Sequence, residues 1–123
     1  MNGENGQRLL GYIESHPFRE AWPTYGLTED DFAELENMIR RQPEAGRVIR
    51  GAGGLRKLRM AAAGRGKSGG YRVLYAIFER HGLVLLVDVY AKNEQEDISP
   101  EGCRRAAELL RHQKATLEAG RYW

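Results

Sequence analysis

Two apolar runs near the middle of the chain limit its possible folds more than any other feature. The first spans Tyr71 to Phe78 and the second spans Leu83 to Tyr90, and both are rich in β-branched, aromatic and aliphatic residues. The residues between them, Glu79 to Gly82, have the length and composition of a hairpin turn, with His81 expected in solvent at its tip. Because both runs are nearly continuous in apolar character, we expect a β-hairpin in a sheet that is covered on both faces.

The N-terminal part predicts one short strand and one short helix. Leu9 to Ile13 is a short apolar run and a candidate edge strand. The tripeptide Ser15-His16-Pro17 then offers a cap and a first-turn proline for a helix over residues 18–24. Phe18 and Trp22 are four positions apart in that helix, so both are expected to point into the core.

Two longer helices have stronger signals. Residues 28–41 open with a threonine N-cap and an acidic first turn, carry apolar residues at helical spacing, and end before a proline. Asp31 and the other acidic side chains of this helix are expected to face solvent. Residues 99–118 open with a serine cap and Pro100, and the predicted apolar stripe of this C-terminal helix includes Leu109.

The resulting order, βααβββα, indicates an α+β domain with a small, mainly antiparallel sheet, two N-terminal helices and a C-terminal helix. At 123 residues we expect a single domain over 1–123, with flexible ends at 1–7 and 119–123. No apolar run is long enough for a transmembrane helix, and the N-terminus lacks the apolar centre of a signal peptide. The single cysteine, Cys103, fits a reducing, cytoplasmic setting.

Charge is distributed very unevenly along the chain. The segment Arg47–Arg72 holds eight Lys and Arg residues and no Asp or Glu, whereas the whole chain has 19 basic and 17 acidic residues. The remainder therefore carries 11 basic against 17 acidic residues, so a strongly cationic segment belongs to an otherwise acidic chain. A local field of this kind suits a polyanion, most commonly a nucleic acid. A merely solvated basic loop is the plainer interpretation, but apolar residues of strand type are interleaved in the run.

Within this segment the pattern predicts a second hairpin. Leu55–Met60 alternates like a strand, and Ala61–Gly70 contains four glycines and predicts a flexible connection to the run that starts at Tyr71. A basic, glycine-rich hairpin of this kind can hold several cations around one bound phosphate.

Neither a nucleotide-hydrolase loop nor a metal site is predicted. Gly66-Lys67-Ser68 is similar to the end of a phosphate-binding loop, but Ala61 stands where that pattern requires glycine, and a strand rather than a helix follows. The histidines at 16, 81 and 112 have no metal-ligand spacing to one another or to the cysteine. We therefore expect no metal and no cofactor.

Five strings of the chain carry a family resemblance when they are taken together. They are Pro43–Gly46, Gly53–Arg59, Gly64–Tyr75, Val89–Glu94 and Asp97–Ser99. Together they resemble the RelE/HigB-like toxins of bacterial toxin–antitoxin pairs, in the RelE/ParE superfamily, over roughly Leu9 to Leu110. The resemblance implies a compact mRNA interferase that cleaves mRNA in the ribosomal decoding site without a metal. It also implies a neutralising antitoxin of the HigA or RelB kind, with its own DNA-binding domain.

The chemistry of the basic residues agrees with this resemblance. RNA is cleaved when its own 2′-OH attacks the adjacent phosphate, which requires a base, cations for the growing charge and an acid for the leaving oxygen. Clustered lysines and arginines can serve without histidine, because mutual repulsion lowers the pKa of a lysine toward neutrality. The candidate catalytic residues are Lys57, Arg59, Arg65, Lys67, Arg72 and Lys92.

Each candidate has an expected role. Lys57 or Lys67 would be the base, and Arg59 and Arg65 would stabilise the transition state. Arg72 matches the Tyr-Arg-Val strand of the family, which implies that it clamps the phosphate.

The remaining assignments concern the leaving group and the RNA. Lys92 is a candidate acid or phosphate contact, and Tyr90 is expected to stack a base or orient a proton. Arg50 and Arg56 are expected to bind nucleic acid. The functional tyrosine of RelE-type members has no counterpart in Glu96–Ser99, so the acid stays open. Each basic residue could equally be a non-catalytic phosphate contact.

Two alternative functions remain beside the endonuclease. The same basic hairpin would serve a non-enzymatic nucleic-acid-binding module, and a gyrase-inhibiting, ParE-like toxin would share the fold. The cluster of lysines and arginines around a strand-borne Arg72 favours the endonuclease.

Overall fold

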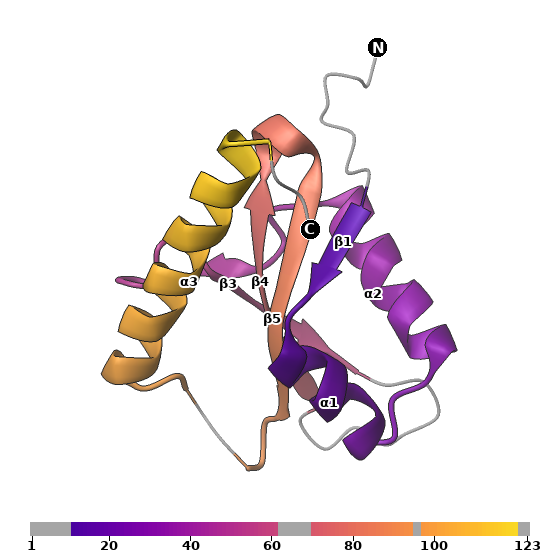
Figure 1. The fold of residues 1–123 in the computed structure, drawn as a ribbon. Coiled ribbons are helices and arrows are strands. Elements are labelled where there is room, and N and C mark those ends of the chain that lie inside the picture. Colours follow the sequence, from indigo (N-terminus) through magenta and orange to yellow (C-terminus); the bar gives the residue numbers. More distant parts are fainter. Residues whose placement is uncertain (1–10, 62–69, 95–96, 121–123) are drawn as a thin grey trace.

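The computed structural model describes residues 11–61, 70–94 and 97–120, which form a five-stranded sheet flanked by three helices (Figure 1). The strands are β1 (Gly11–Glu14), β2 (Arg47–Val48), β3 (Arg56–Met60), β4 (Tyr71–Phe78) and β5 (Leu83–Ala91). They lie in the order β1-β5-β4-β3-β2, and every neighbouring pair is antiparallel except β1 with β5. The predicted α+β class with a small, mainly antiparallel sheet is confirmed.

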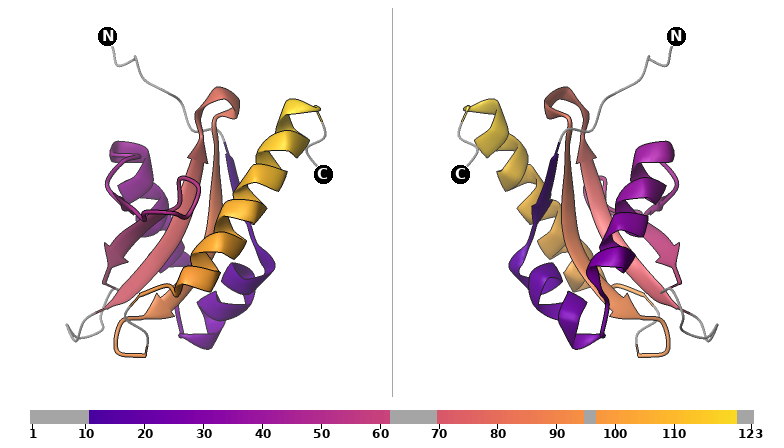
Figure 2. Two further views of the ribbon diagram at one scale, coloured as in Figure 1. Left: turned by 90° about the vertical axis from the view of Figure 1, so that its left-hand side faces the viewer. Right: turned by 90° about the vertical axis from the view of Figure 1, so that its right-hand side faces the viewer.

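The helices cover opposite faces of this sheet. Helices α1 (His16–Thr24) and α2 (Glu29–Arg41) pack on one face, and α3 (Pro100–Glu118) packs on the other, as the two views of Figure 2 show. Among the helices described, none combines the length and apolar composition that crossing a bilayer requires.

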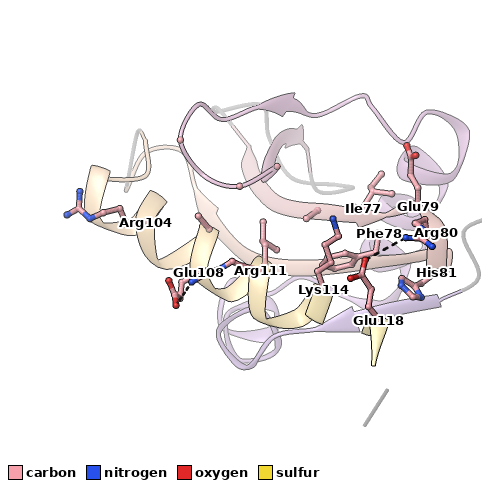
Figure 3. A pocket seen from close by; sticks show the side chains of 16 residues that line it. Ile77, Phe78, Glu79, Arg80, His81, Arg104, Glu108, Arg111, Lys114 and Glu118 are labelled. Atoms are coloured by element: carbon pink, nitrogen blue, oxygen red, sulfur yellow. Dashed lines mark ion pairs between the residues drawn. The ribbon is translucent and has the colours of Figure 1, made fainter. Parts of the chain in front are cut away.

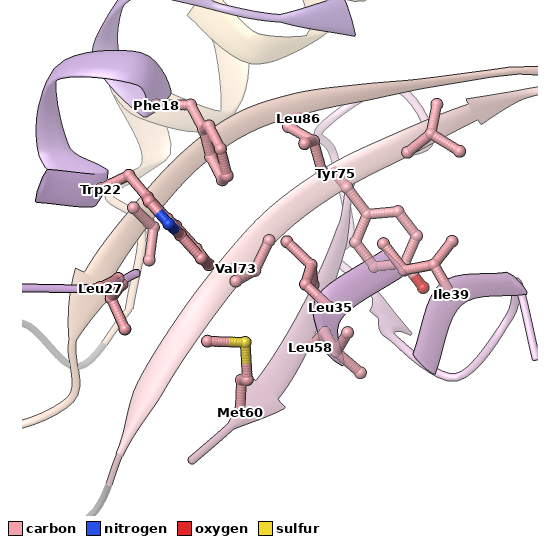
Figure 4. Close-up of a cluster of buried hydrophobic side chains, with 12 residues drawn as sticks. Phe18, Trp22, Leu27, Leu35, Ile39, Leu58, Met60, Val73, Tyr75 and Leu86 are labelled. Carbon is pink, nitrogen blue, oxygen red and sulfur yellow. The ribbon is translucent and has the colours of Figure 1, made fainter. Parts of the chain in front are cut away.

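Two hydrophobic clusters, one on each face, hold the layers together. Along β4, Val73 and Tyr75 point into the cluster under α1 and α2, which also contains Phe18 (Figure 4). The intervening residues Leu74 and Ala76 point into the cluster under α3. Successive strand residues alternate between faces, so a strand with apolar residues at both sets of positions must be covered twice. The prediction that the hairpin is buried on both sides is therefore confirmed.

The central hairpin has the predicted strands and one unexpected detail at its turn. Glu79–His81 forms a single 3-10 turn, and Gly82 then adopts a left-handed conformation with φ 65°. His81 is half-buried and its Nε2 atom is inaccessible to solvent, so the prediction of a solvated histidine was wrong. The strands themselves begin and end within one residue of the predicted bounds.

Helix starts follow the capping signals. Ser15 Oγ accepts a hydrogen bond from Phe18 N at 3.2 Å and donates one to the Val87 carbonyl at 2.6 Å, which ties α1 to β5. Thr28 and Asp31 form a reciprocal capping box at the start of α2. Asp31 is buried by this contact, so the expectation that it faces solvent was wrong.

Further differences from the predictions concern Leu109 and the strand β2, and some predicted segments lie beyond the described residues. Leu109 is 39% exposed on the outer side of α3, whereas the helix buries Ala106 and Leu110 as predicted. The two-residue strand β2 was not predicted, because two residues carry no periodicity. Of the segments predicted to be flexible, residues 1–7, residues 62–69 of the connection 61–70 and residues 121–123 of the end 119–123 lie outside the described residues.

A tyrosine hydroxyl holds the segment that leads into β2. Tyr75 Oη donates to the Pro43 carbonyl at 2.7 Å and accepts from Gly46 N at 2.9 Å. A Cβ atom on Gly46 would lie 2.7 Å from Tyr75 Cε1, so only glycine fits against the ring. Arg56 Nη1 also donates to the Gly46 carbonyl at 2.7 Å. These contacts fix the backbone immediately before Arg47.

We expect Tyr75→Phe to lower the free energy of unfolding by about 1–3 kcal/mol, because it removes the partner of the buried Gly46 N–H. Burial raises the pKa of Tyr75, so its contribution is present below the ordinary tyrosine pKa and is lost as the pH rises toward the raised value. Urea denaturation of the unchanged protein and of Tyr75→Phe measures both the loss of stability and its dependence on pH. The series runs from about pH 7 to about pH 10.5, so that it passes the ordinary tyrosine pKa of about 10. Tyr71→Phe is the matched control, since the Tyr71 hydroxyl makes only a 3.4 Å contact with the Tyr25 carbonyl. Equal losses in the two variants would contradict the assignment.

Candidate nucleic-acid interface

A row of three paired residues crosses the sheet on the face that packs against α3. Arg59 of β3 pairs with Arg72 of β4, and Arg72 pairs in turn with Tyr90 of β5. Tyr90 belongs to the hydrophobic cluster under α3. Directly paired strand residues share a face of the sheet, so both arginines emerge on the α3 side.

A second row lies beside the first on the same face. Arg47 of β2 pairs with Lys57 of β3, and Lys57 pairs with Leu74 of β4, whose side chain also lies in the cluster under α3. The two rows therefore bring four basic side chains together on one side of the sheet. We call this group the cationic face: Arg47, Lys57, Arg59 and Arg72.

Arg72 is the least accessible member of the cationic face. Its side chain is 8% exposed, and Nη1 donates to the Tyr71 carbonyl at 3.3 Å. Burying a guanidinium is costly, and a second arginine directly opposite adds repulsion. An anion between Arg59 and Arg72 would interact favourably with both guanidinium groups.

Lys57 is held by a carboxylate from the segment that precedes α3. Its Nζ atom lies 2.7 Å from Asp97 Oδ1, with the two side chains 25% and 72% exposed. This hydrogen bond lowers the pKa of the Asp97 carboxyl, and the charge of Arg47 lowers it further. Before Lys57 could act as a base, its ammonium would have to lose both a proton and this partner.

Lys92 lies in the turn that leaves β5, two residues after Tyr90, which pairs with Arg72 of the cationic face. Its side chain is exposed, and its backbone N donates to the Gly70 carbonyl at 3.1 Å, which joins this turn to the start of β4. Gly70 has φ 66°, and a Cβ atom there would lie 2.6 Å from the Met60 carbonyl oxygen. The ends of β3, β4 and β5 thus meet at one glycine.

Three predicted contacts are not part of this face. Arg56 pairs with Tyr75, and its guanidinium donates to the carbonyls of Gly46 and Glu44, so it supports the backbone on the opposite face. Tyr90 is 4% exposed within the cluster under α3, which leaves no open ring face for a base. Arg50 is exposed in the turn before β3, beside the far end of β4 from Arg72. The nucleic-acid roles expected for Arg56 and Tyr90 stay predictions, and in this structure Arg56 contacts the backbone of Gly46 while Tyr90 packs in the cluster under α3.

Two predicted residues lie outside the described part of the chain, and two unpredicted ones join the site. Arg65 and Lys67 fall in the segment 62–69. Arg47 and Asp97 were not assigned a role from the sequence. The partner of each is set by strand register and by the path of the chain before α3, and the residue pattern shows neither.

The protonation of Asp88, on β5 beside Leu74, depends on burial. Burial raises the pKa of Asp88, while the Val89 N–H, which donates to Oδ1 at 2.8 Å, opposes this rise. A raised pKa means that the folded chain holds this proton more tightly than the unfolded chain. The free energy of unfolding therefore falls as the pH rises from the ordinary aspartate pKa through the raised one.

We accordingly expect Asp88→Asn to be more stable than the unchanged protein at pH 7, with no difference at pH 3, where the carboxyl is protonated in both states. An amide oxygen can still accept from Val89 N. Chemical denaturation at the two pH values measures this. Asp30→Asn is the control, because that exposed acid in the first turn of α2 stabilises the helix dipole and its loss should destabilise slightly. A gain at pH 7 that persists at pH 3 would count against the explanation.

A separate groove of about 790 Å³ lies between α3, the end of β4 and the glycine-rich turn before β3 (Figure 3). Ala76, Phe78 and Leu110 contribute apolar surface, and the ion pair between Arg80 and Glu118, at 3.8 Å, crosses one end. No member of the cationic face lines this groove. The two features are therefore distinct.

The described residues offer no metal site. Within residues 11–61, 70–94 and 97–120, no three His, Cys, Asp or Glu side chains come together as a metal site requires. His16, for example, pairs with Glu20 at 3.1 Å on the surface of α1.

Comparison with known proteins places this arrangement in a family. A family model described as "RelE toxin of RelE / RelB toxin-antitoxin system" matches residues 33–119, which is most of the chain. A solved structure of a variant of the E. coli toxin RelE in the free state is similar at 19% identity, over 69% of this chain and 85% of that chain, with a TM-score of 0.48. The toxin–antitoxin complex RelBE of E. coli gives 18% identity, 70% and 96% coverage, and a TM-score of 0.47. On the family match, this chain belongs to the RelE toxin family of toxin–antitoxin systems.

Proposed function

We propose that this protein is a ribosome-dependent mRNA endonuclease that cleaves through the 2′-OH of the RNA. The single observation that carries the proposal is the pairing of Arg59 with Arg72 on the face that also carries Lys57, in a chain of the RelE toxin family. A phosphate between the two arginines would be held by planar, bidentate donors. The same donors would stabilise the extra negative charge of a pentacoordinate phosphorane more strongly than the ground state.

Roles for the individual residues follow from their positions. Arg72, which is nearly buried, would be the fixed phosphate contact, and the exposed Arg59 would close on the phosphate from the solvent side. Lys57, as an ammonium, would hold a phosphate after Asp97 has left it, so the base that takes the proton of the 2′-OH would be Lys67, the other candidate from the sequence. Lys92, at the exit of β5, would donate to the leaving 5′-oxygen or hold the next phosphate. Arg65 and Lys67 remain candidates from the sequence alone.

The first test is cleavage of translated mRNA by purified protein and ribosomes, with Arg72→Ala as the variant. Loss of one transition-state donor is expected to slow cleavage by about two to three orders of magnitude. Arg80→Ala is the matched control, because Arg80 is exposed at the opposite end of β4. Circular dichroism and urea denaturation of both variants establish that each is folded. Near-full cleavage by folded Arg72→Ala would show that the site has been misplaced.

The ends of the products test the chemistry. A 2′,3′-cyclic phosphate with a 5′-hydroxyl is expected, because attack by the neighbouring 2′-OH leaves those groups. A 5′-phosphate would indicate attack by an activated water, commonly one bound to a metal, and would overturn the lysine–arginine mechanism. Binding without any cleavage would favour a non-enzymatic module, and growth arrest with intact mRNA and damaged DNA would favour a gyrase inhibitor.

We also propose that a small cognate antitoxin neutralises this protein, as the family implies, and that it docks away from the cationic face. An interface that depends on apolar contacts weakens little with added salt, whereas one that depends on exposed charge pairs weakens steeply. We therefore expect the antitoxin to bind with similar affinity at about 0.1 M and about 0.5 M salt. The Debye length is about 10 Å at the lower concentration and roughly half of that at the higher one, so exposed charge pairs would be screened much more strongly in the second. Calorimetric titration with the antitoxin measures the affinity at each concentration.

Lys57→Ala and Arg72→Ala provide the second arm of that experiment. Both are expected to bind the antitoxin as tightly as the unchanged toxin. A large loss of affinity in either variant would mean that the antitoxin covers the cationic face itself.

A further inference from the structure

Among the residues that the structure describes, Asp97 is an acidic residue that contacts the cationic face through Lys57. It lies two residues before the serine that caps α3, and its carboxylate reaches back across the sheet to Lys57 Nζ at 2.7 Å. The Lys57 side chain is mostly covered and Asp97 is mostly exposed, so the carboxylate approaches from the solvent side. That is the direction from which a substrate phosphate would also have to approach.

Arg47 is a second cation whose charge acts on the same carboxylate. The register places Arg47 opposite Lys57 on one face of the sheet, and the side chain of Arg47 is exposed. The pKa of Asp97 is lowered chiefly by Lys57 and further by Arg47, so the carboxylate lies within the field of both cations. Asp97 therefore contacts Lys57 directly, and Arg47, which pairs with Lys57 in the register, adds a second positive charge nearby.

The backbone that carries Arg47 is held independently of Asp97. Gly46, immediately before it, is fixed by the Tyr75 hydroxyl at 2.9 Å and by Arg56 Nη1 at 2.7 Å. Since these contacts do not involve Asp97, the position of Arg47 beside Lys57 should survive when the carboxylate leaves. The anion site is thus preorganised rather than created by its internal occupant.

We propose that Arg47 and Lys57 form a binding subsite for an RNA phosphodiester next to the Arg59–Arg72 pair, and that Asp97 fills this subsite in the free protein as an internal competitor. A carboxylate and a phosphodiester carry the same sign of charge and accept the same hydrogen bonds, so only one of them can hold Lys57 at a time. Partly exposed ion pairs contribute little to stability, so a phosphate can displace Asp97 without unfolding the segment before α3. The inference deepens the proposed function and rests on it for the identity of the anion.

The test is binding of a short single-stranded RNA with 2′-O-methyl riboses, which cannot be cleaved through the 2′ position. Fluorescence polarisation of the labelled RNA gives the affinity at several salt concentrations. Asp97→Asn is expected to tighten binding by about two- to fivefold, the range in which exposed ion pairs act. Arg47→Ala is expected to weaken binding and to make the salt dependence of log K shallower by about 0.7, as the loss of one phosphate contact does for single strands.

Two controls separate displacement from a general change of charge. Glu101→Gln removes one negative charge four residues further along the chain, where Glu101 pairs with Arg105 at 3.3 Å rather than with the cationic face. It should tighten binding much less than Asp97→Asn. In a Lys57→Met background, Asp97→Asn should lose most of its effect, because the ammonium for which the two anions compete is absent. Equal effects of Asp97→Asn and Glu101→Gln, or an unchanged Asp97 effect without Lys57, would overturn the subsite.

The outcome for the subsite can be distinguished from the outcome for the enzyme. Tighter RNA binding by Asp97→Asn without cleavage on ribosomes would retain the subsite and reject the endonuclease. Cleavage by the unchanged protein, with no effect of Asp97 or Arg47 on binding, would retain the endonuclease and reject the subsite.

Discussion

The hydrogen-bond register of β4 against β3 and β5 is the constraint on which both packing and the cationic face depend. Each residue of β4 faces one of two hydrophobic clusters, and its neighbours across the sheet face the same way. A slip of one residue would turn Arg72 into the cluster beneath α1 and α2 and bring Val73 to the α3 side. The apolar residues on both faces make such a slip very costly. The same forces that build the core therefore fix where the charges emerge.

The cationic face gathers like charges on one side of the sheet. Arg72 is nearly buried, Arg59 lies directly across from it, and Lys57 beside them pairs with Asp97. Folding tolerates this arrangement because two separate clusters stabilise the sheet from both sides. Local rules are commonly broken at functional sites and compensated elsewhere, and here the compensation comes from the layers that enclose β4.

Elements with strong periodicity or capping signals could be predicted from the sequence, and contacts set by register could not. The central hairpin and the capped helices follow from apolar runs and from residues such as Ser99. The backbone contact of Arg56 and the burial of Tyr90 could not be predicted from the sequence, because an alternating strand shows two faces without showing which one is covered. Asp31 was misplaced for a different reason: a capping box buries a carboxylate that composition alone assigns to solvent. The position of Asp97 depends on how the chain returns toward α3, which no local pattern records.

The close approach of Gly70 to the Met60 carbonyl has a consequence for how this architecture can diverge. The connection between β3 and β4 is closed at its base by that contact, and the Lys92 backbone reinforces the same point. The entropic cost of closing a loop grows only with the logarithm of its length. Insertions or deletions between Met60 and Gly70 should therefore change the free energy of folding only slightly. Cations carried by the strands keep their spacing through such changes, whereas cations carried by the connection do not. Relatives could thus replace the connection and change the charges it carries, while the cationic face carried by the strands stays unchanged.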